Sequence, residues 1–233
     1  MLKRLGVLLA GLLFVSITGA AEKSAPPTTS WKAGKNYFVI DPPQPTASGD
    51  KVEVLEVFSY ACPHCAHFQP YAEQLKQSLP AYARYGYMPA VFNADWEPSA
   101  RAFYTAQSLG VLDQTHQALF DALHRDHIPL RTIDDLAAFY AQHGVDKAKF
   151  LAESASFEVE SKLSRANEIV KKDGIDGTPS VVVNGKYRVT AASAGGYPQL
   201  LELVDWLVKK EHASAGPAQH TTPVQPAKHV KKK

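Results

Sequence analysis

The two cysteines of this 233-residue chain lie in one short motif, Cys62-Pro63-His64-Cys65. A thiol pair with this spacing is typical of redox chemistry, in which a thiolate attacks a disulfide and a second thiol completes the exchange. A c-type haem site needs a histidine directly after the second cysteine, and Ala66 stands there instead, which excludes haem attachment. A structural zinc site usually needs four Cys or His ligands, and a disulfide across so small a loop constrains the unfolded chain little. We therefore favour a redox pair over zinc and over a purely structural disulfide.

The motif follows a predicted buried strand and opens a predicted helix. Residues Val52–Ser59 are almost continuously apolar, as in a strand buried on both faces, and a helix with one apolar face is predicted over Cys62–Leu79. Unpaired N–H groups and the helix dipole stabilise a negative sulfur at a helix N-terminus, and His64 adds a further donor. The pKa of Cys62 should therefore be low, while Cys65, one turn further on, should be more buried. A low thiol pKa stabilises the reduced form, so the pair is expected to donate disulfides rather than remove them.

Glu56 is a second candidate for chemistry, because strand alternation places it on one face with Val52, Val54 and Phe58. Its side chain is therefore predicted to point inward among apolar groups. A buried carboxyl has a raised pKa and can pass protons. The alternative is an exposed strand carboxylate, as we expect for Glu53.

The order of the predicted elements indicates an α/β domain interrupted by helices. The predicted strands are Tyr37–Ile40, Val52–Ser59, Arg84–Phe92, Ser180–Val183 and Tyr187–Thr190. The Asn184-Gly185 pair predicts a tight turn between the last two strands, and a final amphipathic helix is predicted over Pro198–Lys210. Residues 96–173 carry mainly helical signals, among them Thr132 with Asp135 as a capping box. Strands at both ends with helices between them predict an α/β fold with a helical insertion.

Residues 1–21 are predicted to be a secretory signal peptide. Two basic residues precede an apolar stretch over Leu5–Ile17, and small residues at Ala20 and Ala21 offer a cleavage site. The apolar stretch is shorter than the ~18–20 residues of a membrane-spanning helix, which disfavours an uncleaved anchor. We therefore expect an exported protein in a compartment where disulfides persist.

The basic residues of the chain are concentrated at its ends. The formal net charge is +2, but the acid-free stretches 1–20 and 212–233 hold six of the 25 Lys and Arg residues, which leaves 19 bases against 23 acids in the body. An acidic body argues against a nucleic-acid binder, so no nucleic-acid partner is expected. From their composition, residues 22–35 are expected to be a flexible leader and residues 212–233 a disordered basic tail.

His116, His124 and His127 lie close together in the helical part of the sequence. No acid or cysteine completes a metal-ligand pattern of known spacing around them, so a solvated helix face is expected rather than a metal site.

The segment Phe58-Ser59-Tyr60-Ala61-Cys62-Pro63-His64-Cys65 resembles the active-site segment of the DsbA family of periplasmic thiol oxidases, whose dipeptide between the cysteines is Pro-His. Pro70 matches a proline found in thioredoxin helices. Further along, Gly177-Thr178-Pro179-Ser180 looks like the cis-proline loop of that family, and its hairpin follows. The resemblance covers roughly residues 50 to 210.

The resemblance implies a thioredoxin fold with an inserted all-helical domain. Residues 36–95 and 174–211 would form the thioredoxin-like domain, and residues 96–173 the insertion. By the same resemblance, Cys62 is the nucleophile, Cys65 is the resolving thiol, and Pro63 and His64 are the dipeptide between them. Pro179 is expected to be cis and to hold the backbone of Thr178 against an extended substrate. Glu56 takes the place of the buried acid of thioredoxin-like enzymes, six residues before Cys62, and is expected to take the proton of Cys65.

These expectations describe a monomeric oxidase of the bacterial periplasm that needs no cofactor of its own. Its Cys62–Cys65 disulfide would pass to reduced, newly exported proteins, and a membrane quinone reductase of the DsbB type would restore it. A disulfide isomerase or reductase of the same fold is an alternative, although isomerases of this compartment usually add a dimerisation domain, for which residues 22–50 are too few. Two functions of a different class stay open as well: a redox-inactive binding protein and a metal-binding module.

Overall fold

A mixed five-stranded sheet lies at the centre of the described part of the chain, residues 30–215, in a computed structural model of the protein. The strands are β1 (Phe38–Val39), β2 (Val52–Phe58), β3 (Ala83–Pro89), β4 (Ser180–Val183) and β5 (Tyr187–Thr190). They are ordered β1-β5-β4-β2-β3, and only the β2–β3 pair of this sheet is parallel. The apolar run of β2 places it inside this sheet, between β3 and β4, as a strand buried on both faces requires.

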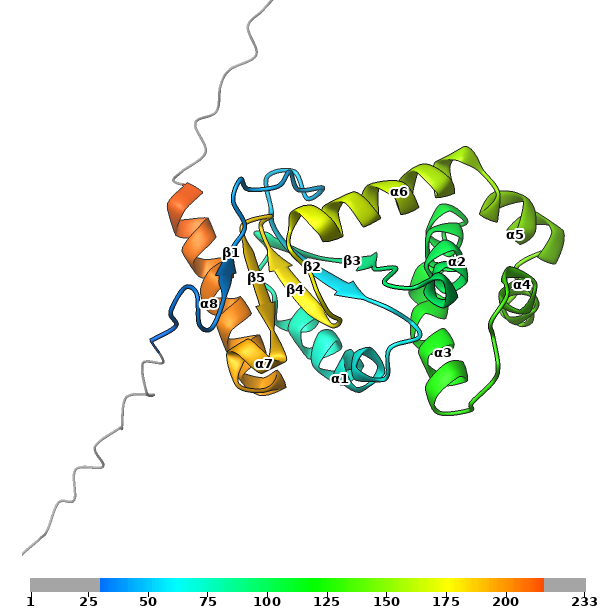
Figure 1. The fold of residues 1–233 in the computed structure, drawn as a ribbon, viewed down its shortest axis with the longest axis horizontal. Helices are drawn as coiled ribbons and strands as arrows, with labels where there is room; N and C mark the ends of the chain where they lie inside the picture. The colour runs from blue at the N-terminus through cyan, green and yellow to red at the C-terminus, as the bar shows by residue number, and fades with distance from the viewer. Residues whose placement is uncertain (1–29, 216–233) are drawn as a thin grey trace, which may run out of the picture. The chain divides into compact units, whose positions relative to one another are not determined.

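Helices cover the sheet and fill the long connection between β3 and β4. They are α1 (Pro63–Ser78), α2 (Glu97–Ser108), α3 (Leu112–His124), α4 (Ile133–Gln142), α5 (Lys147–Ser154), α6 (Phe157–Lys172), α7 (Ala191–Ala194) and α8 (Tyr197–Ala215). A short 3-10 turn, Ala94–Trp96, precedes α2. Figure 1 shows α2 to α5 grouped beyond β3, with α6 running back from them toward the sheet. The predicted α/β fold with an all-helical insertion is confirmed.

Two apolar cores follow from this arrangement. Helices α1 and α8 pack on one face of the sheet through residues such as Phe68 and Leu203. A second core starts from the other face, at Val57 and Val182, and continues among the helices of the insertion. Both cysteines belong to this second core, so the motif lies where the sheet meets the insertion.

Some predicted boundaries differ from the observed ones. Cys62 keeps an extended backbone, with φ −90° and ψ 115°, and is the N-cap of α1 rather than its first residue. Strand β3 ends at Pro89 and not at Phe92, because β2 ends at Phe58; the N–H of Ala90 still donates to the carbonyl of Phe58 at 2.8 Å, and the pairing of the two strands stops there. The capping box at the start of α4 and the turn between β4 and β5 were both predicted and are confirmed, with φ of 53° and 63° at the two turn residues.

Some residues that were predicted to belong to the flexible leader and to the disordered tail are part of the fold. The leader was expected to extend to residue 35. However, the N–H of Gly34 donates to the carbonyl of Tyr37 at 2.8 Å, and Trp31 packs against the core that α1 and α8 form on one face of the sheet. At the other end, α8 continues to Ala215, so residues 212–215 of the predicted tail are helical. The predicted signal peptide 1–21 and the remainder of the leader and tail lie outside the described residues.

Glu211 joins α8 to the hairpin and generates a stability prediction. Its carboxylate, whose side chain is 3% exposed, accepts hydrogen bonds from Asn184 Nδ2 at 2.8 Å, Lys186 Nζ at 2.6 Å and Tyr187 OH at 3.0 Å. We expect Glu211→Ala to lower the free energy of unfolding by about 2–4 kcal/mol in urea titrations, because three partners lose their acceptor. Asp205→Ala in the same helix is the control.

Asp205 forms an exposed pair with Lys209 and should cost at most about 0.5 kcal/mol. Equal losses for the two variants would contradict the assignment of Glu211 as the anchor of α8.

Candidate active site

Cys62 and Cys65 lie at the start of α1, where β2 turns into the helix. The turn is closed by the N–H of Cys62, which donates to the carbonyl of Ser59 at 3.1 Å, and the helix begins with the N–H of Cys65 donating to the carbonyl of Cys62 at 3.0 Å. Both cysteines are free thiols in this structure. Cys62 is 5% exposed and Cys65 is fully buried, which is the order of burial that the sequence predicted.

The loop containing Thr178 and Pro179 lies against the first cysteine. When Cys62 carries its proton, its Sγ donates to the carbonyl oxygen of Thr178 at 3.4 Å, although the two residues are 116 positions apart. The Thr178–Pro179 peptide bond is cis, as predicted. The loop that follows the insertion and the start of α1 are thus brought together at one sulfur atom.

The surroundings of the two sulfurs shift their pKa values in opposite directions. A hydrogen bond from the Cys65 thiol is the largest influence on Cys62. Together with the contact to Thr178 and the backbone N–H groups of Cys65 and His64, it overcomes the opposing effect of burial and lowers the pKa of Cys62 to about 5. Burial raises the pKa of Cys65 far above its ordinary value. The reduced pair therefore holds one thiolate and one thiol. The backbone N–H of His64 contributes to this low pKa, and the role expected for its exposed side chain stays a prediction.

Glu56 points into the interior, as strand alternation predicted. It has no exposed surface, its Oε2 accepts a hydrogen bond from Tyr85 OH at 2.7 Å, and its Oε1 has no partner among residues 30–215. Burial raises the pKa of Glu56 to about 7, and the Tyr85 hydrogen bond partly opposes this. The expectation that Glu53 is exposed was wrong. It is 8% exposed, and its Oε2 accepts from the N–H of Ala47 at 2.9 Å.

Two histidines reach the active-site turn from α3, which the sequence did not predict. His116 is 6% exposed and its Nδ1 lies 2.7 Å from Tyr60 OH, while Nε2 of the partly buried His124 lies 2.7 Å from the carbonyl oxygen of Tyr60. The prediction of a solvated helix face was therefore wrong for His116, which is buried. For His124, which is partly buried, it missed the contact with Tyr60. Their spacing of four residues on either side of the apolar Phe120 was the available signal, since it places all three on the buried face of the helix.

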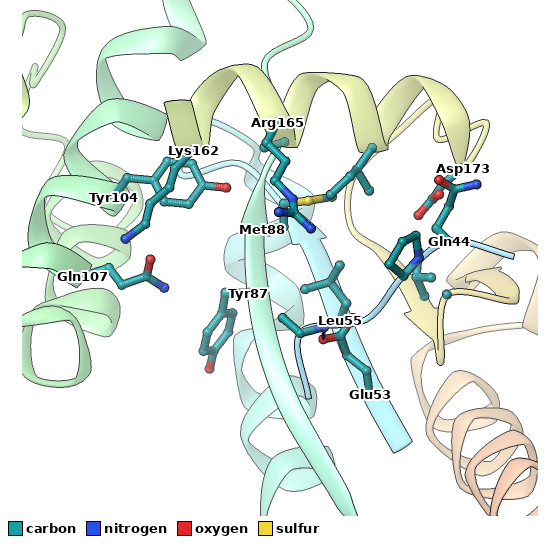
Figure 2. Close-up of a pocket in the computed structure, with 16 residues that line it drawn as sticks. Gln44, Glu53, Leu55, Tyr87, Met88, Tyr104, Gln107, Lys162, Arg165 and Asp173 are labelled. Atoms are coloured by element: carbon teal, nitrogen blue, oxygen red, sulfur yellow. Dashed lines mark hydrogen bonds between the residues drawn. The ribbon is translucent and has the colours of Figure 1, made fainter. Parts of the chain in front are cut away.

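A separate hollow of about 250 Å³ lies between α6 and the sheet, and Figure 2 shows the side chains around it. Tyr104 and Lys162 lie at one end, Asp173 and Gln44 at the other, with Arg165 between them. Burial, helped by the charge of Glu53, raises the pKa of Asp173 to about 6. No predicted site residue lines this hollow, so the thiol chemistry lies elsewhere, at the start of α1.

Two further properties concern residues 30–215 alone. No group of three or more His, Cys, Asp and Glu side chains there is arranged to hold a metal ion. No helix in this stretch has the length and apolar character needed to cross a membrane.

Comparison with known proteins agrees with this geometry. Residues 84–202 match the family model of the DSBA-like thioredoxin domain. The thiol:disulfide interchange protein DsbA of Pseudomonas aeruginosa is 37% identical over 209 residues, which cover 90% of this chain and 97% of the relative. DsbA of Azotobacter vinelandii is 36% identical over 210 residues, with the same coverage of 90% and 97%. This chain belongs to the DsbA family. It is a thiol:disulfide oxidoreductase.

Solved structures of DsbA proteins show the same fold. The crystal structure of Pseudomonas aeruginosa DsbA matches with a TM-score of 0.75 at 39% identity and covers 79% of this chain and 96% of that one. The oxidoreductase NmDsbA1 from Neisseria meningitidis matches with a TM-score of 0.67 at 29% identity, covering 78% and 94%. The thioredoxin fold with a helical insertion is therefore shared with relatives of known structure.

The raised pKa of Glu56 predicts how stability depends on pH. Because its pKa is about 7 in the folded protein and near 4.5 in the unfolded chain, the stability that the protonated carboxyl contributes is complete below pH 4.5 and is lost as pH rises through 7. Glu56→Gln cannot ionise and should therefore gain about 2–3 kcal/mol relative to the parent protein between pH 4 and pH 8. Urea unfolding of the reduced proteins at both pH values measures this gain.

Glu73→Gln is the control for that measurement, because Glu73 is an exposed residue of α1. Its difference from the parent should be the same at both pH values. A Glu56→Gln difference that does not change with pH would show that Glu56 is not a buried acid with a raised pKa.

Proposed function

We propose that this DsbA-family protein is an oxidase that donates its Cys62–Cys65 disulfide to reduced polypeptides newly exported to the bacterial periplasm. The opposite pKa shifts of the two cysteines carry this proposal. Since the reduced form keeps a stabilised thiolate on Cys62, reduction is favoured and the disulfide is readily given away. A reductase would need the reverse preference.

The exchange proceeds in two thiol–disulfide steps. A client thiolate attacks the Sγ of Cys62, the Cys62–Cys65 bond breaks, and Cys65 leaves and takes up a proton, because its pKa is high. A second client thiolate then attacks the client sulfur of the mixed disulfide and releases Cys62 as a thiolate. The client loses two electrons and forms a disulfide, and the protein gains those electrons as a dithiol.

Glu56 is assigned the exchange of a proton with Cys65. A carboxyl with a pKa of about 7 is partly protonated at neutral pH, so it can give a proton to Cys65 when the client is oxidised and take it back when the disulfide is restored. Its second oxygen, Oε1, has no partner within residues 30–215 and is free to carry that proton.

Clients are proposed to bind in extended form along the backbone of Thr178, beside the cis Pro179. The support is the position of the Thr178 carbonyl, 3.4 Å from the sulfur that would carry the mixed disulfide. Pro63 and His64 are exposed next to this sulfur and are proposed to form the adjoining surface that meets the client.

The remaining assignments extend this proposal to the whole chain. Residues 1–21 direct export and are removed, residues 212–233 end in a basic tail, and the mature protein acts as a monomer in the periplasm. Helices α2 to α6 support a helical domain over 96–173, inserted between thioredoxin-like parts 36–95 and 174–211. A membrane quinone reductase of the DsbB type is proposed to reoxidise the dithiol.

Single cysteine variants test the proposal with a reduced, unfolded polypeptide that contains two cysteines. The oxidised parent protein should convert it to a disulfide in a one-to-one reaction, followed by titration of free thiols. Cys65→Ser, mixed with the same polypeptide in its disulfide form, should accumulate a mixed disulfide through Cys62, because the resolving thiol is missing. Cys62→Ser should form no mixed disulfide, since its remaining thiol is buried with a high pKa, and it should not oxidise the reduced polypeptide, because it holds no disulfide to donate.

The yield of folded client should also be measured. If Cys62→Ser raises this yield as much as the parent protein does, the protein is a redox-inactive binding protein and not an oxidase. A second comparison uses clients that carry incorrect disulfides. If the protein rearranges these disulfides faster than it oxidises reduced clients, it is an isomerase.

A further inference from the structure

Tyr60, two residues before Cys62, is held at both its side chain and its backbone by one helix of the insertion. Its hydroxyl lies 2.7 Å from Nδ1 of His116, and its carbonyl oxygen lies 2.7 Å from Nε2 of His124. Both histidines belong to α3, whereas Tyr60 follows β2. These two contacts join the insertion to the segment that presents the nucleophile.

The position of Tyr60 within that segment gives the contacts their importance. Tyr60 lies inside the tight turn in which the N–H of Cys62 donates to the carbonyl of Ser59 at 3.1 Å. The Oγ of Ser59 accepts a further bond from the N–H of Ala61 at 3.2 Å, and the carbonyl oxygen of Tyr60 meets His124 of α3. Fixing Tyr60 therefore fixes the direction in which Cys62 begins α1.

The chemistry of His116 suits a permanent attachment. Its ring is buried among aromatic side chains, with ring centroids 5.2 Å from Phe58, 4.3 Å from Tyr87 and 5.3 Å from Phe120. Burial lowers the pKa of His116 to about 3, and the charge of Lys76 lowers it further, so the ring stays neutral. Because a neutral ring offers one acceptor nitrogen, Nδ1 can accept a hydrogen bond from Tyr60 OH at pH values well above 3.

In the contact of His124 with Tyr60, the histidine is the donor and not the acceptor. A carbonyl oxygen can only accept, so Nε2 of His124 must donate to Tyr60. Helix α3 thus supplies one acceptor and one donor to the same residue, and Phe120 packs between them with its ring centroid 4.9 Å from that of Tyr60. Three contacts from successive turns of one helix leave Tyr60 a single orientation.

We propose that His116 and His124 are positioning residues which, by holding Tyr60, let the helical insertion set the reactivity of the Cys62 thiol. The backbone N–H groups of His64 and Cys65 must point at the Cys62 sulfur to stabilise its negative charge, and their direction depends on how the turn enters α1. This inference rests on the proposed function in one respect, namely that Cys62 is the nucleophilic thiolate.

The test is the pKa of the Cys62 thiolate, measured in the full-length protein from the absorbance of the thiolate at 240 nm. His124→Phe keeps the ring and removes the donor, and Tyr60→Phe removes only the hydroxyl that meets His116. Each should raise the thiolate pKa by about half a unit, which lowers the alkylation rate by iodoacetamide about threefold at a pH below that pKa. His124→Gln, which retains an N–H donor, should recover part of the shift.

His143→Phe is the matched control. His143 lies at the end of α4 in the same insertion, and its Nδ1 is 3.0 Å from the carbonyl oxygen of Phe139, so the variant loses a similar hydrogen bond that does not reach Tyr60. It should lower the melting temperature to a comparable extent and leave the thiolate pKa unchanged. The comparison separates a loss of positioning from a general loss of stability.

Three outcomes distinguish the claims. Raised thiolate pKa values in His124→Phe and Tyr60→Phe, with none in His143→Phe, would support the proposal. Unchanged values in the first two variants, beside a low value in the parent protein, would overturn it and leave the proposed function intact. An ordinary thiol pKa in the parent protein would overturn both. Tyr60→Phe is the smaller change and serves if His124→Phe does not fold.

Discussion

A negative charge on the sulfur of Cys62 is the constraint on which the rest of the structure depends. A thiolate at the edge of an apolar core needs hydrogen-bond donors that no other group uses, and the first turn of a helix supplies them because its N–H groups have no partners within the helix. Cys65 adds its own thiol as a donor and is buried deeply enough to keep its proton. The pair is therefore unequal before any client arrives, and that inequality favours giving the disulfide away.

The sheet and the helical insertion both help to position the residues around the two unequal thiols. The sheet ends β2 at Phe58, so that the chain turns directly into α1, and it brings the Thr178–Pro179 loop to the same sulfur through the β2–β4 pairing. The insertion, far away in sequence, closes the second core and reaches back to Tyr60 through α3. Residues 84–202, which match the family domain, include the insertion as well as the hairpin, in keeping with a site to which both parts contribute.

Local patterns were sufficient to predict an α/β domain with a helical insertion and the reacting pair, because these features depend on short stretches of sequence, whereas the thioredoxin fold and the cis Pro179 were expected from the family resemblance. The buried strand, the helix that starts at the motif, the capping box at Thr132 and the inward direction of Glu56 all follow from periodicity and termination signals. Contacts between distant elements were not predictable in this way. The spacing of His116 from Phe120 indicated a buried helix face, but its contacts with Tyr60 and Tyr87 could not be predicted, because these residues come from segments that the sequence does not show to be adjacent to α3. The burial of Glu53 depends instead on the irregular loop just before β2, where the N–H of Ala47 and the Oγ of Ser48 donate to its carboxylate.

The central claim is that stabilisation of the Cys62 thiolate makes the disulfide a strong oxidant, and the reduction potential of the Cys62–Cys65 pair tests it most directly. The purified protein is equilibrated with glutathione buffers of graded ratio, and the fraction of reduced protein is read from alkylated thiols. The account predicts a potential more oxidising than about −200 mV, well above the glutathione couple. A potential below about −250 mV would contradict it, because the disulfide would then be too stable to pass to exported proteins.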